Sequence, residues 1–276
     1  MSDRIHIERQ GGVADVRLNR PDKMNALDPA MFDALIDTAD ELAADASLRC
    51  VVLSGHGRSF CAGLDFGSFQ RMAGDEEEGA ADRPSAVLSV AEGRITHRAQ
   101  QAVYGWTELP VPVIAAVHGH ALGGGIQLAL GADIRIVHPE TKLSVLEIRW
   151  GLVPDMTGTQ SLVNLVGLDV AKELTFTGRM VDGAEAVALG LCTRLDDDPH
   201  AAAMTMATEI AGKSPDAVRG AKRLFNLAPK VSTAEGFANE RTEINKLIGS
   251  PNQTEQISAF FEKRQPDFAD PVDDAE

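Results

Sequence analysis

Residues 111–137 read VPVIAAVHGHALGGGIQLALGADIRIV. The β-rich runs Val111–Val117 and Asp133–Val137 predict two strands, and the glycine cluster between them predicts a turn that opens a helix over Gly124–Leu130. A strand, a helix and a second strand in this order favour a parallel sheet with a right-handed crossover. This stretch therefore predicts an α/β fold built in layers.

The N-terminal segment adds further elements to the same sheet. Ile5–Leu18 has two runs of alternating apolar and polar residues on either side of a Gly-Gly pair, which predicts a β-hairpin. Asp28 followed by Pro29 is typical of a helix start, and an apolar stripe predicts that this helix continues to about Ala44. The run Cys50–Leu53 predicts another strand.

Beyond residue 157 the sequence predicts helices alone. Signals for helix starts recur there, each a Ser, Thr or Asp followed directly by Pro or, three residues later, by Glu or Gln. The first residues of these signals are Thr157, Asp182, Ser214, Ser232 and Ser250. Three aspartates before Pro199 interrupt the pattern and divide the chain into a core, residues 1–198, and a helical C-terminal region, residues 199–276.

Composition limits the classes of function. With 26 Lys and Arg against 41 Asp and Glu the net charge is -15, which disfavours binding to nucleic acid or to an anionic membrane. The three cysteines and seven histidines have neither disulfide-framework nor metal-ligand spacing. The sequence shows no apolar run of the ~20 residues that span a bilayer and no apolar segment near its start. We expect a cytoplasmic protein without a metal, with a solvent-facing acidic loop over Arg71–Gly93.

Two glycine-rich segments each follow a predicted strand. The first, residues 55–65, reads GHGRSFCAGLD and lacks the third glycine of a dinucleotide-binding turn. Its Cys61 could be a nucleophile, but no thiol-protease signature surrounds it. The second, residues 119–125, reads GHALGGG and opens the predicted helix. Free N–H groups there would suit an oxyanion hole, although close helix–strand packing would require the same glycines.

Two carboxylates follow the second glycine segment. Glu147 has an apolar residue on each side, so burial would raise its pKa and make it a proton acceptor near neutral pH. The alternative is an ion pair with the nearby Arg149. Asp155 could cap the next helix, but the pattern at Thr157 already predicts a capping box there. Asp155 is thereby left for another task.

Five segments in this order resemble the crotonase superfamily, the enoyl-CoA hydratase/isomerase group. They are LNRPDKMNAL at 18–27, SFCAGLD at 59–65, HGHALGGG at 118–125, the segment 147–160, and FFEKR at 260–264. Each segment alone is weak, but their order and spacing cover nearly the whole chain. The resemblance implies a crotonase-like spiral of ββα turns, followed by a helical C-terminal region that assembles homotrimers or dimers of trimers.

The resemblance also implies a site. The substrate would be an acyl-CoA thioester, so that coenzyme A enters as part of the substrate and no other cofactor is needed. The thioester oxygen would accept hydrogen bonds from the backbone N–H groups of Leu64 and Gly124, which stabilise an enolate. Contacts to the CoA portion would come from Lys23, Ala26, Ala62, Phe260 and Lys263, the last two possible across a subunit boundary.

Two positions depart from the hydratases of this family. Gln127 stands where they have a first glutamate, and an amide cannot accept the proton of an attacking water. Asp155 stands where typical hydratases have glycine. Dienoyl-CoA isomerases have an aspartate there that works opposite the glutamate, and a dehalogenase branch uses it as the nucleophile.

These departures favour double-bond isomerisation, with Glu147 as the acid/base. Asp155 would be its partner. Hydration of 2-enoyl-CoA, in which Glu147 activates water with help from Gln127 or Asp155, is the alternative. A catalytically silent acyl-CoA-binding protein is the alternative from another functional class.

Overall fold

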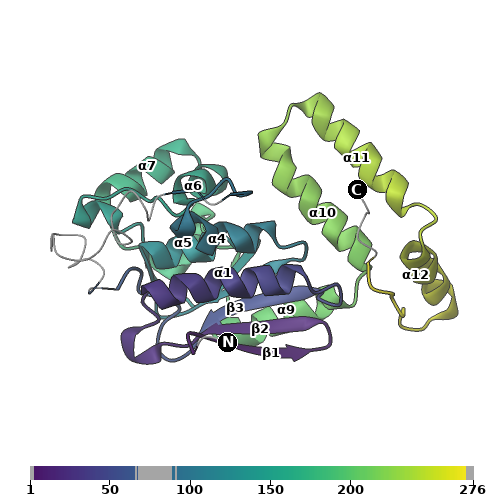
Figure 1. Ribbon diagram of the computed structural model, residues 1–276, viewed down its shortest axis with the longest axis horizontal. Helices are drawn as coiled ribbons and strands as arrows, with labels where there is room; N and C mark the ends of the chain where they lie inside the picture. The colour runs from purple at the N-terminus through teal and green to yellow at the C-terminus, as the bar shows by residue number, and fades with distance from the viewer. Residues whose placement is uncertain (1–2, 66, 68–88, 91, 272–276) are drawn as a thin grey trace.

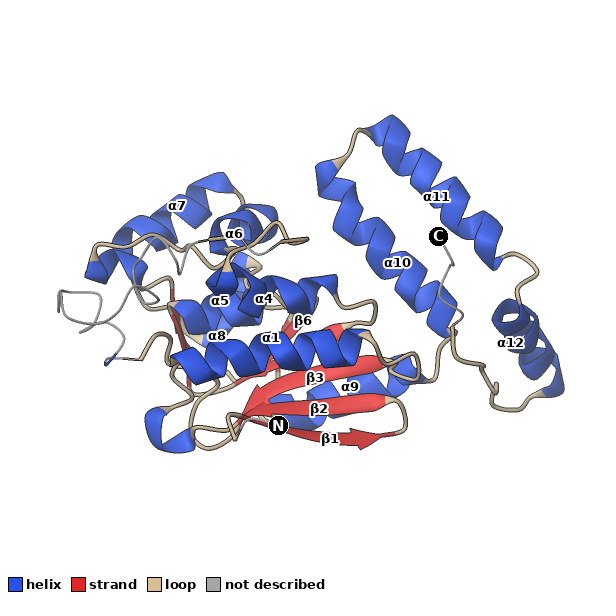
Figure 2. Cartoon of the chain, viewed as in Figure 1, coloured by secondary structure: helices blue, strands red, loops and turns tan. Residues whose placement is uncertain are grey.

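The sheet at the centre of the molecule has six strands in the order β1-β2-β3-β4-β6-β8, and β5 pairs with β7 in a second sheet (Figure 2). The computed structural model describes residues 3–65, 67, 89–90 and 92–271. The strands are β1 (Ile5–Gln10), β2 (Val13–Leu18), β3 (Cys50–Gly55), β4 (Val113–Val117), β5 (His120–Leu122), β6 (Ile134–Val137), β7 (Lys142–Ser144) and β8 (Arg194–Leu195). Most of the loop expected over Arg71–Gly93 lies outside the described residues.

Helices surround the sheet and form the C-terminal part of the chain. They are α1 (Pro29–Ala43), α4 (Arg98–Glu108), α5 (Gly124–Leu130), α6 (Gly158–Val166), α7 (Leu168–Thr177), α8 (Gly183–Leu189), α9 (Pro199–Ala211), α10 (Pro215–Leu227), α11 (Thr233–Leu247) and α12 (Pro251–Glu262), with 3-10 turns η1 (Pro21–Lys23), η3 (Glu147–Trp150) and η4 (Ala228–Lys230). None of the described helices combines the length and apolar character that a membrane crossing requires.

The sheet confirms the predicted mixed α/β fold. Strands β1 and β2 pair antiparallel across Gly11 and Gly12, whose φ angles of 57° and 77° suit a tight hairpin turn. Every other neighbouring pair in the large sheet is parallel. Helix α5 lies between β4 and β6 in the sequence, so the predicted strand–helix–strand unit is present.

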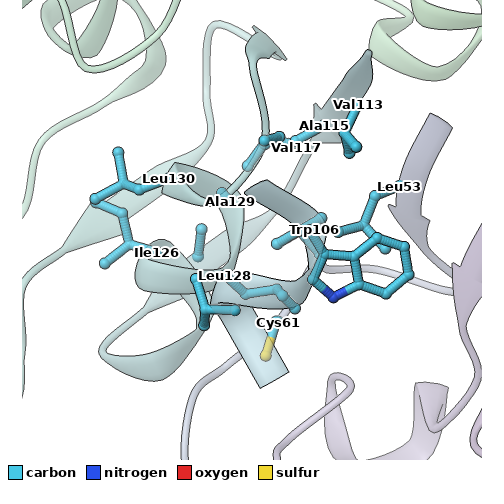
Figure 3. Close-up of a cluster of buried hydrophobic side chains, with 14 of the residues drawn as sticks. Leu53, Cys61, Trp106, Val113, Ala115, Val117, Ile126, Leu128, Ala129 and Leu130 are labelled. Atoms are coloured by element: carbon cyan, nitrogen blue, oxygen red, sulfur yellow. The ribbon is translucent and has the colours of Figure 1, made fainter. Parts of the chain in front are cut away.

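Both faces of the inner strands are buried, which explains why residues 50–53 of β3 and all of β4 are apolar. Val51 and Leu53 of β3 belong to the larger hydrophobic cluster, with side chains of α1, α4 and α5. Cys50 and Val52 belong to a smaller cluster with side chains of α9. Figure 3 shows part of the larger cluster, including the fully buried Trp106 of α4.

Helix α9 packs on the sheet, whereas α10, α11 and α12 extend away from it (Figure 1). The division of the chain at residue 198 stays a prediction, but α9 follows that point and shares a core with the strands. Lys222 attaches α10 to the core. Its buried Nζ donates to the carbonyl oxygen of Val111 at 2.9 Å and to the carboxylate of Asp133 at 2.8 Å.

The predicted helix starts are confirmed, with one wrong capping pattern. The side chains of Asp182, Ser232 and Ser250 accept hydrogen bonds from the third helical residue, and α10 begins after Ser214 as predicted. Thr157 precedes α6 but caps nothing, because its φ of 68° turns it into the left-handed region and its side chain makes no cap bond. The expectation of helices alone beyond residue 157 is also wrong, since β8 pairs parallel with β6.

The closeness of the two glycine segments gives a stability test. A Cβ at Gly125 would lie 2.1 Å from the carbonyl oxygen of Cys61. We expect Gly125→Ala to lower the free energy of unfolding by about 3 kcal/mol or more, because two backbones must separate. Gly236→Ala in α11 is the matched control, since a Cβ there meets open space. It should stabilise the protein by about 0.5–1 kcal/mol. Urea unfolding followed by circular dichroism measures both, and equal stability of Gly125→Ala and wild type would contradict the contact.

Candidate functional site

The two glycine segments lie side by side. Phe60 N–H donates to the His118 carbonyl at 2.8 Å, and Cys61 N–H donates to the His120 carbonyl at 2.9 Å. Leu122 N–H in turn donates to the Cys61 carbonyl at 3.1 Å. Segments 59–65 and 118–125, which the sequence separates by about fifty residues, therefore share one edge of the fold.

Gly63 allows this close approach. Its φ is 86°, and a Cβ there would lie 2.4 Å from the Leu122 carbonyl oxygen and 3.5 Å from the Gly124 amide nitrogen. The next residue, Leu64, forms a parallel bridge with Leu27, but the bridge uses the carbonyl of Gly63 and the amide of Asp65. Within the described chain no hydrogen bond engages the N–H of Leu64 or of Gly124. The two predicted donors are thus close together and unengaged.

Asn25 organises the loop that packs against this edge. Its side chain is fully buried, accepts from Arg20 N–H at 2.8 Å and donates to the carbonyls of Ser59 at 2.8 Å and Phe60 at 3.1 Å. Its φ of 55° lies in the left-handed region, where asparagine is over-represented. The sequence pattern did not predict this role for Asn25, and the one signal it offered was an asparagine in a turn that contains no glycine.

The predicted CoA-contacting residues of the N-terminal half are brought together by this loop. Ala62 N–H donates to the Met24 carbonyl at 2.9 Å, and Leu27 N–H donates to the Gly63 carbonyl at 2.8 Å. Lys23, at the end of η1, is exposed, while Ala26 is buried and Ala62 half-buried. These three residues therefore lie next to the Gly63–Leu64 turn.

An ion pair fixes the same turn from its other side. Arg20 Nη1 donates to the Asp65 carboxylate at 2.8 Å and to the Ala26 carbonyl at 3.1 Å. Both charged side chains are largely shielded from solvent. The sequence did not predict this pair, because the two residues are 45 positions apart.

Glu147 begins the turn η3 and is only 8% exposed. Its Oε1 accepts a hydrogen bond from Gln127 Nε2 at 2.5 Å, and its buried Oε2 has no hydrogen-bond partner among the described residues. Burial raises the pKa of this carboxyl as predicted, and the nearby charge of Asp155 adds to the rise. Within the described residues, Glu147 forms no ion pair with Arg149. A Cβ at Gly123 would lie 3.4 Å from Oε1, so the carboxylate borders the second glycine segment.

Gln127 in α5 links Glu147 to the segment that carries Asp155. Its Oε1 accepts from Met156 N–H at 2.8 Å and from Gly158 N–H at 3.0 Å. These bonds explain the wrong capping prediction, because the backbone before α6 is held by Gln127 and not by the Thr157 side chain. Asp155 itself is exposed between two buried neighbours.

The remaining predicted residues do not join the site within one chain. Phe260 is 73% exposed on α12, and Lys263 ends that helix. Helix α12 lies far from α5 and α6 (Figure 1). Contacts from these two residues across a subunit boundary stay a prediction. Cys61 is fully buried, and burial raises its pKa to about 12, which argues against a nucleophilic thiolate.

The raised pKa of Glu147 predicts that the contribution of this residue to the free energy of unfolding depends on pH. Burial favours the protonated carboxyl in the folded protein, so the stability that Glu147 contributes is full at acidic pH and is lost as pH rises through its folded pKa. Glu147→Gln removes this loss. We expect the variant to gain stability relative to wild type as pH rises from 4 to 8, and thermal unfolding at each pH measures the difference.

Glu235 supplies a control whose contribution to stability depends on pH in the opposite direction. Hydrogen bonds from the backbone and hydroxyl of Ser232 lower its pKa, so its contribution is present at neutral pH and is lost as pH falls. Glu235→Gln should therefore be less stable than wild type at neutral pH, with a difference that shrinks on acidification. A pH-independent difference for Glu147→Gln would contradict its raised pKa.

Comparisons with known proteins identify the family of this chain. The family model described as Enoyl-CoA hydratase/isomerase matches residues 8–271. The chain is 36% identical to a Thermus thermophilus protein provisionally named an enoyl-CoA hydratase, over 96% of this chain and 100% of that one. It is 31% identical to mouse mitochondrial methylglutaconyl-CoA hydratase, over 95% of this chain and 82% of that one.

Solved structures agree as well. An enoyl-CoA hydratase from Bacillus anthracis superposes with a TM-score of 0.86 at 31% identity, covering 97% of this chain and 100% of that one. This likeness confirms the crotonase-like fold that the resemblance implied. The match of the family model over nearly the whole chain and the identity to named relatives lead to one conclusion. The chain belongs to the enoyl-CoA hydratase/isomerase family.

Proposed function

We propose that this protein converts unsaturated acyl-CoA thioesters, with Glu147 exchanging protons with the acyl chain or with water. One observation carries the proposal. Among the described residues, nothing hydrogen-bonds the buried Oε2 of Glu147, and this carboxylate borders a glycine segment whose Gly124 N–H, like that of Leu64, is also without a hydrogen bond. Lys23, Ala26 and Ala62 would contact the CoA portion beside the same turn. No further cofactor is part of the proposal.

The chemistry follows from charge development. Removing a proton alpha or vinylogous to a thioester, or adding water to the conjugated double bond, places negative charge on the thioester oxygen. Two backbone donors held in place before the reaction stabilise this charge, and each typically lowers the barrier by about 3 kcal/mol. A carboxyl whose pKa is raised by burial is a better proton acceptor and a better donor near neutral pH.

Two reactions remain candidates, each favoured by its own observation. Hydration is favoured by the relatives, which are named hydratases. In hydration Glu147 would take a proton from a water whose oxygen bonds to C3, and Glu147 would then pass that proton to C2. Isomerisation is favoured by Gln127, which cannot act as a second base. There Glu147 would move a proton between carbons, with Asp155 as a possible partner.

Isotope labelling separates the two reactions. We expect Glu147→Gln to lower turnover about a hundredfold or more on the best of a panel of 2-enoyl, 3-enoyl and dienoyl thioesters. In H₂¹⁸O, mass spectrometry of the product would show one ¹⁸O atom after hydration and none after isomerisation. Glu41→Gln, which removes only a surface ion pair with Arg9, is the control and should keep full activity.

Three outcomes would contradict the proposal. Unchanged turnover by Glu147→Gln would remove this residue from the mechanism. Binding of acyl-CoA esters in calorimetry, with no turnover of any thioester in the panel, would identify a silent binding protein. A covalent adduct on Asp155 in mass spectrometry would instead indicate the dehalogenase type of chemistry.

We also propose that the chain assembles as a homotrimer or a dimer of trimers through its C-terminal helices. Large apolar side chains are exposed there, among them Phe225, Phe237, Phe260 and Phe261. An exposed apolar surface of this kind favours association.

The oligomeric state has a direct test. We expect sedimentation equilibrium to give three or six times the chain mass of 29.4 kDa. Phe225→Asp should shift the distribution toward smaller species, because a charge in an apolar contact is costly to desolvate. Circular dichroism checks that the variant is folded. A monomer at all concentrations for wild type would contradict this part of the proposal.

A further inference from the structure

Both polar ends of the Gln127 side chain are committed to protein groups. The side chain is 1% exposed, its Oε1 accepts two backbone N–H groups, and its Nε2 donates to Glu147. A carboxamide oxygen has two lone pairs, so Oε1 has none left for a water. The two N–H donors also fix the orientation of the amide, because a rotated amide would set Nε2 against the N–H groups of Met156 and Gly158.

We propose that Gln127 is a positioning residue. Its amide N–H binds Oε1 of Glu147, which leaves Oε2 of Glu147 as the oxygen that exchanges the proton. The amide oxygen of Gln127 ties the segment that carries Asp155 to the same carboxylate. This inference rests on the proposed function of Glu147. It does not depend on Gln127 holding a water.

The backbone is built around this arrangement. A Cβ at Gly158 would lie 2.6 Å from Gln127 Oε1, so a side chain at position 158 would displace the amide. On the other side, a Cβ at Gly123 would approach Glu147 Oε1 to 3.4 Å. The hydrogen-bonded pair is therefore enclosed between two positions that carry no side chain.

The link also sets the place of the second carboxylate. Asp155 directly precedes Met156, whose N–H is bound to Gln127 at 2.8 Å. Asp155 is the charged side chain whose field acts on Glu147, and the Arg149 side chain of η3 is exposed. Gln127 thus determines how far apart the two carboxylates stand, whether the reaction uses one of them or both.

Two substitutions at position 127 distinguish the role of the amide oxygen from the role of the amide nitrogen. Gln127→Met removes both sets of hydrogen bonds while nearly keeping the volume. Gln127→Glu keeps an acceptor for Met156 and Gly158 but sets a second carboxyl against Glu147. Gln101 supplies the matched control, because it is also a buried glutamine on a helix, with bonds to Thr96 and Glu108 outside the site.

The carboxyl titration of Glu147 is the first readout. It is followed by ¹³C NMR of protein labelled at glutamate Cδ, with the signal assigned from Glu147→Gln. Gln127→Met should raise the titration midpoint, because the carboxylate loses its donor. Gln127→Glu should give a coupled pair with two midpoints separated by more than about one pH unit. Gln101→Met and Gln101→Glu should leave the midpoint unchanged.

Hydrogen exchange is the second readout. The amides of Met156 and Gly158 should exchange roughly five- to tenfold faster in Gln127→Met than in wild type, and near the wild-type rate in Gln127→Glu. Where turnover is measurable, the acidic limb of kcat/KM should move with the NMR midpoint, and kcat should fall more than KM rises.

A wild-type titration of Glu147 in both Gln127 variants would overturn the proposal, as would unchanged exchange in Gln127→Met. If Gln127→Met does not fold, the coupled titration in Gln127→Glu still decides. Neither NMR nor exchange needs substrate. The titration of Glu147 could therefore shift in the Gln127 variants while the wild type turns over no thioester. That result would support the positioning role of Gln127 and refute the proposed function.

Discussion

The contact between two stretches of backbone, segments 59–65 and 118–125, is the constraint on which the site depends. Gly63 and Gly125 each take a place where a Cβ would lie within 2.4 Å of a carbonyl oxygen of the other segment. The absence of side chains at these points sets the spacing of the Leu64 and Gly124 amides. It also sets the direction in which α5 leaves the turn, and α5 carries Gln127 to Glu147.

Much of the fold could be predicted from local pattern. Alternation and a Gly-Gly pair identified the hairpin, Asp28-Pro29 identified the start of α1, and the apolar run before the glycines identified β4, because each signal acts within a few residues. The same locality explains the failures. Arg194–Leu195 is too short to show a period, and it is a strand only because β6 offers an open edge.

Part of the candidate site could be predicted from neighbouring residues in the sequence, and the family resemblance implied further residues. An acidic residue between apolar neighbours is buried with a raised pKa, and consecutive glycines place free amides at a helix start. The residues that organise the site, Asn25 and Gln127, could not be predicted in this way. Asn25 acts on carbonyls more than thirty positions away, and Gln127 replaces a cap that Thr157 has the right pattern to supply. Such partners are selected by tertiary distance, which a local pattern does not contain.

The attachment of α10 has a mechanical consequence. Lys222 and Arg219 bind carbonyl and carboxylate groups of the core, while α11 and α12 extend beyond this helix. Helix α10 is about 20 Å long, and its Asn226 also donates to the Thr107 carbonyl at 3.1 Å, so it is bonded to the core at three positions. A rotation of α10 relative to the core must break these hydrogen bonds, so the same three side chains restrain the position of α11 and α12.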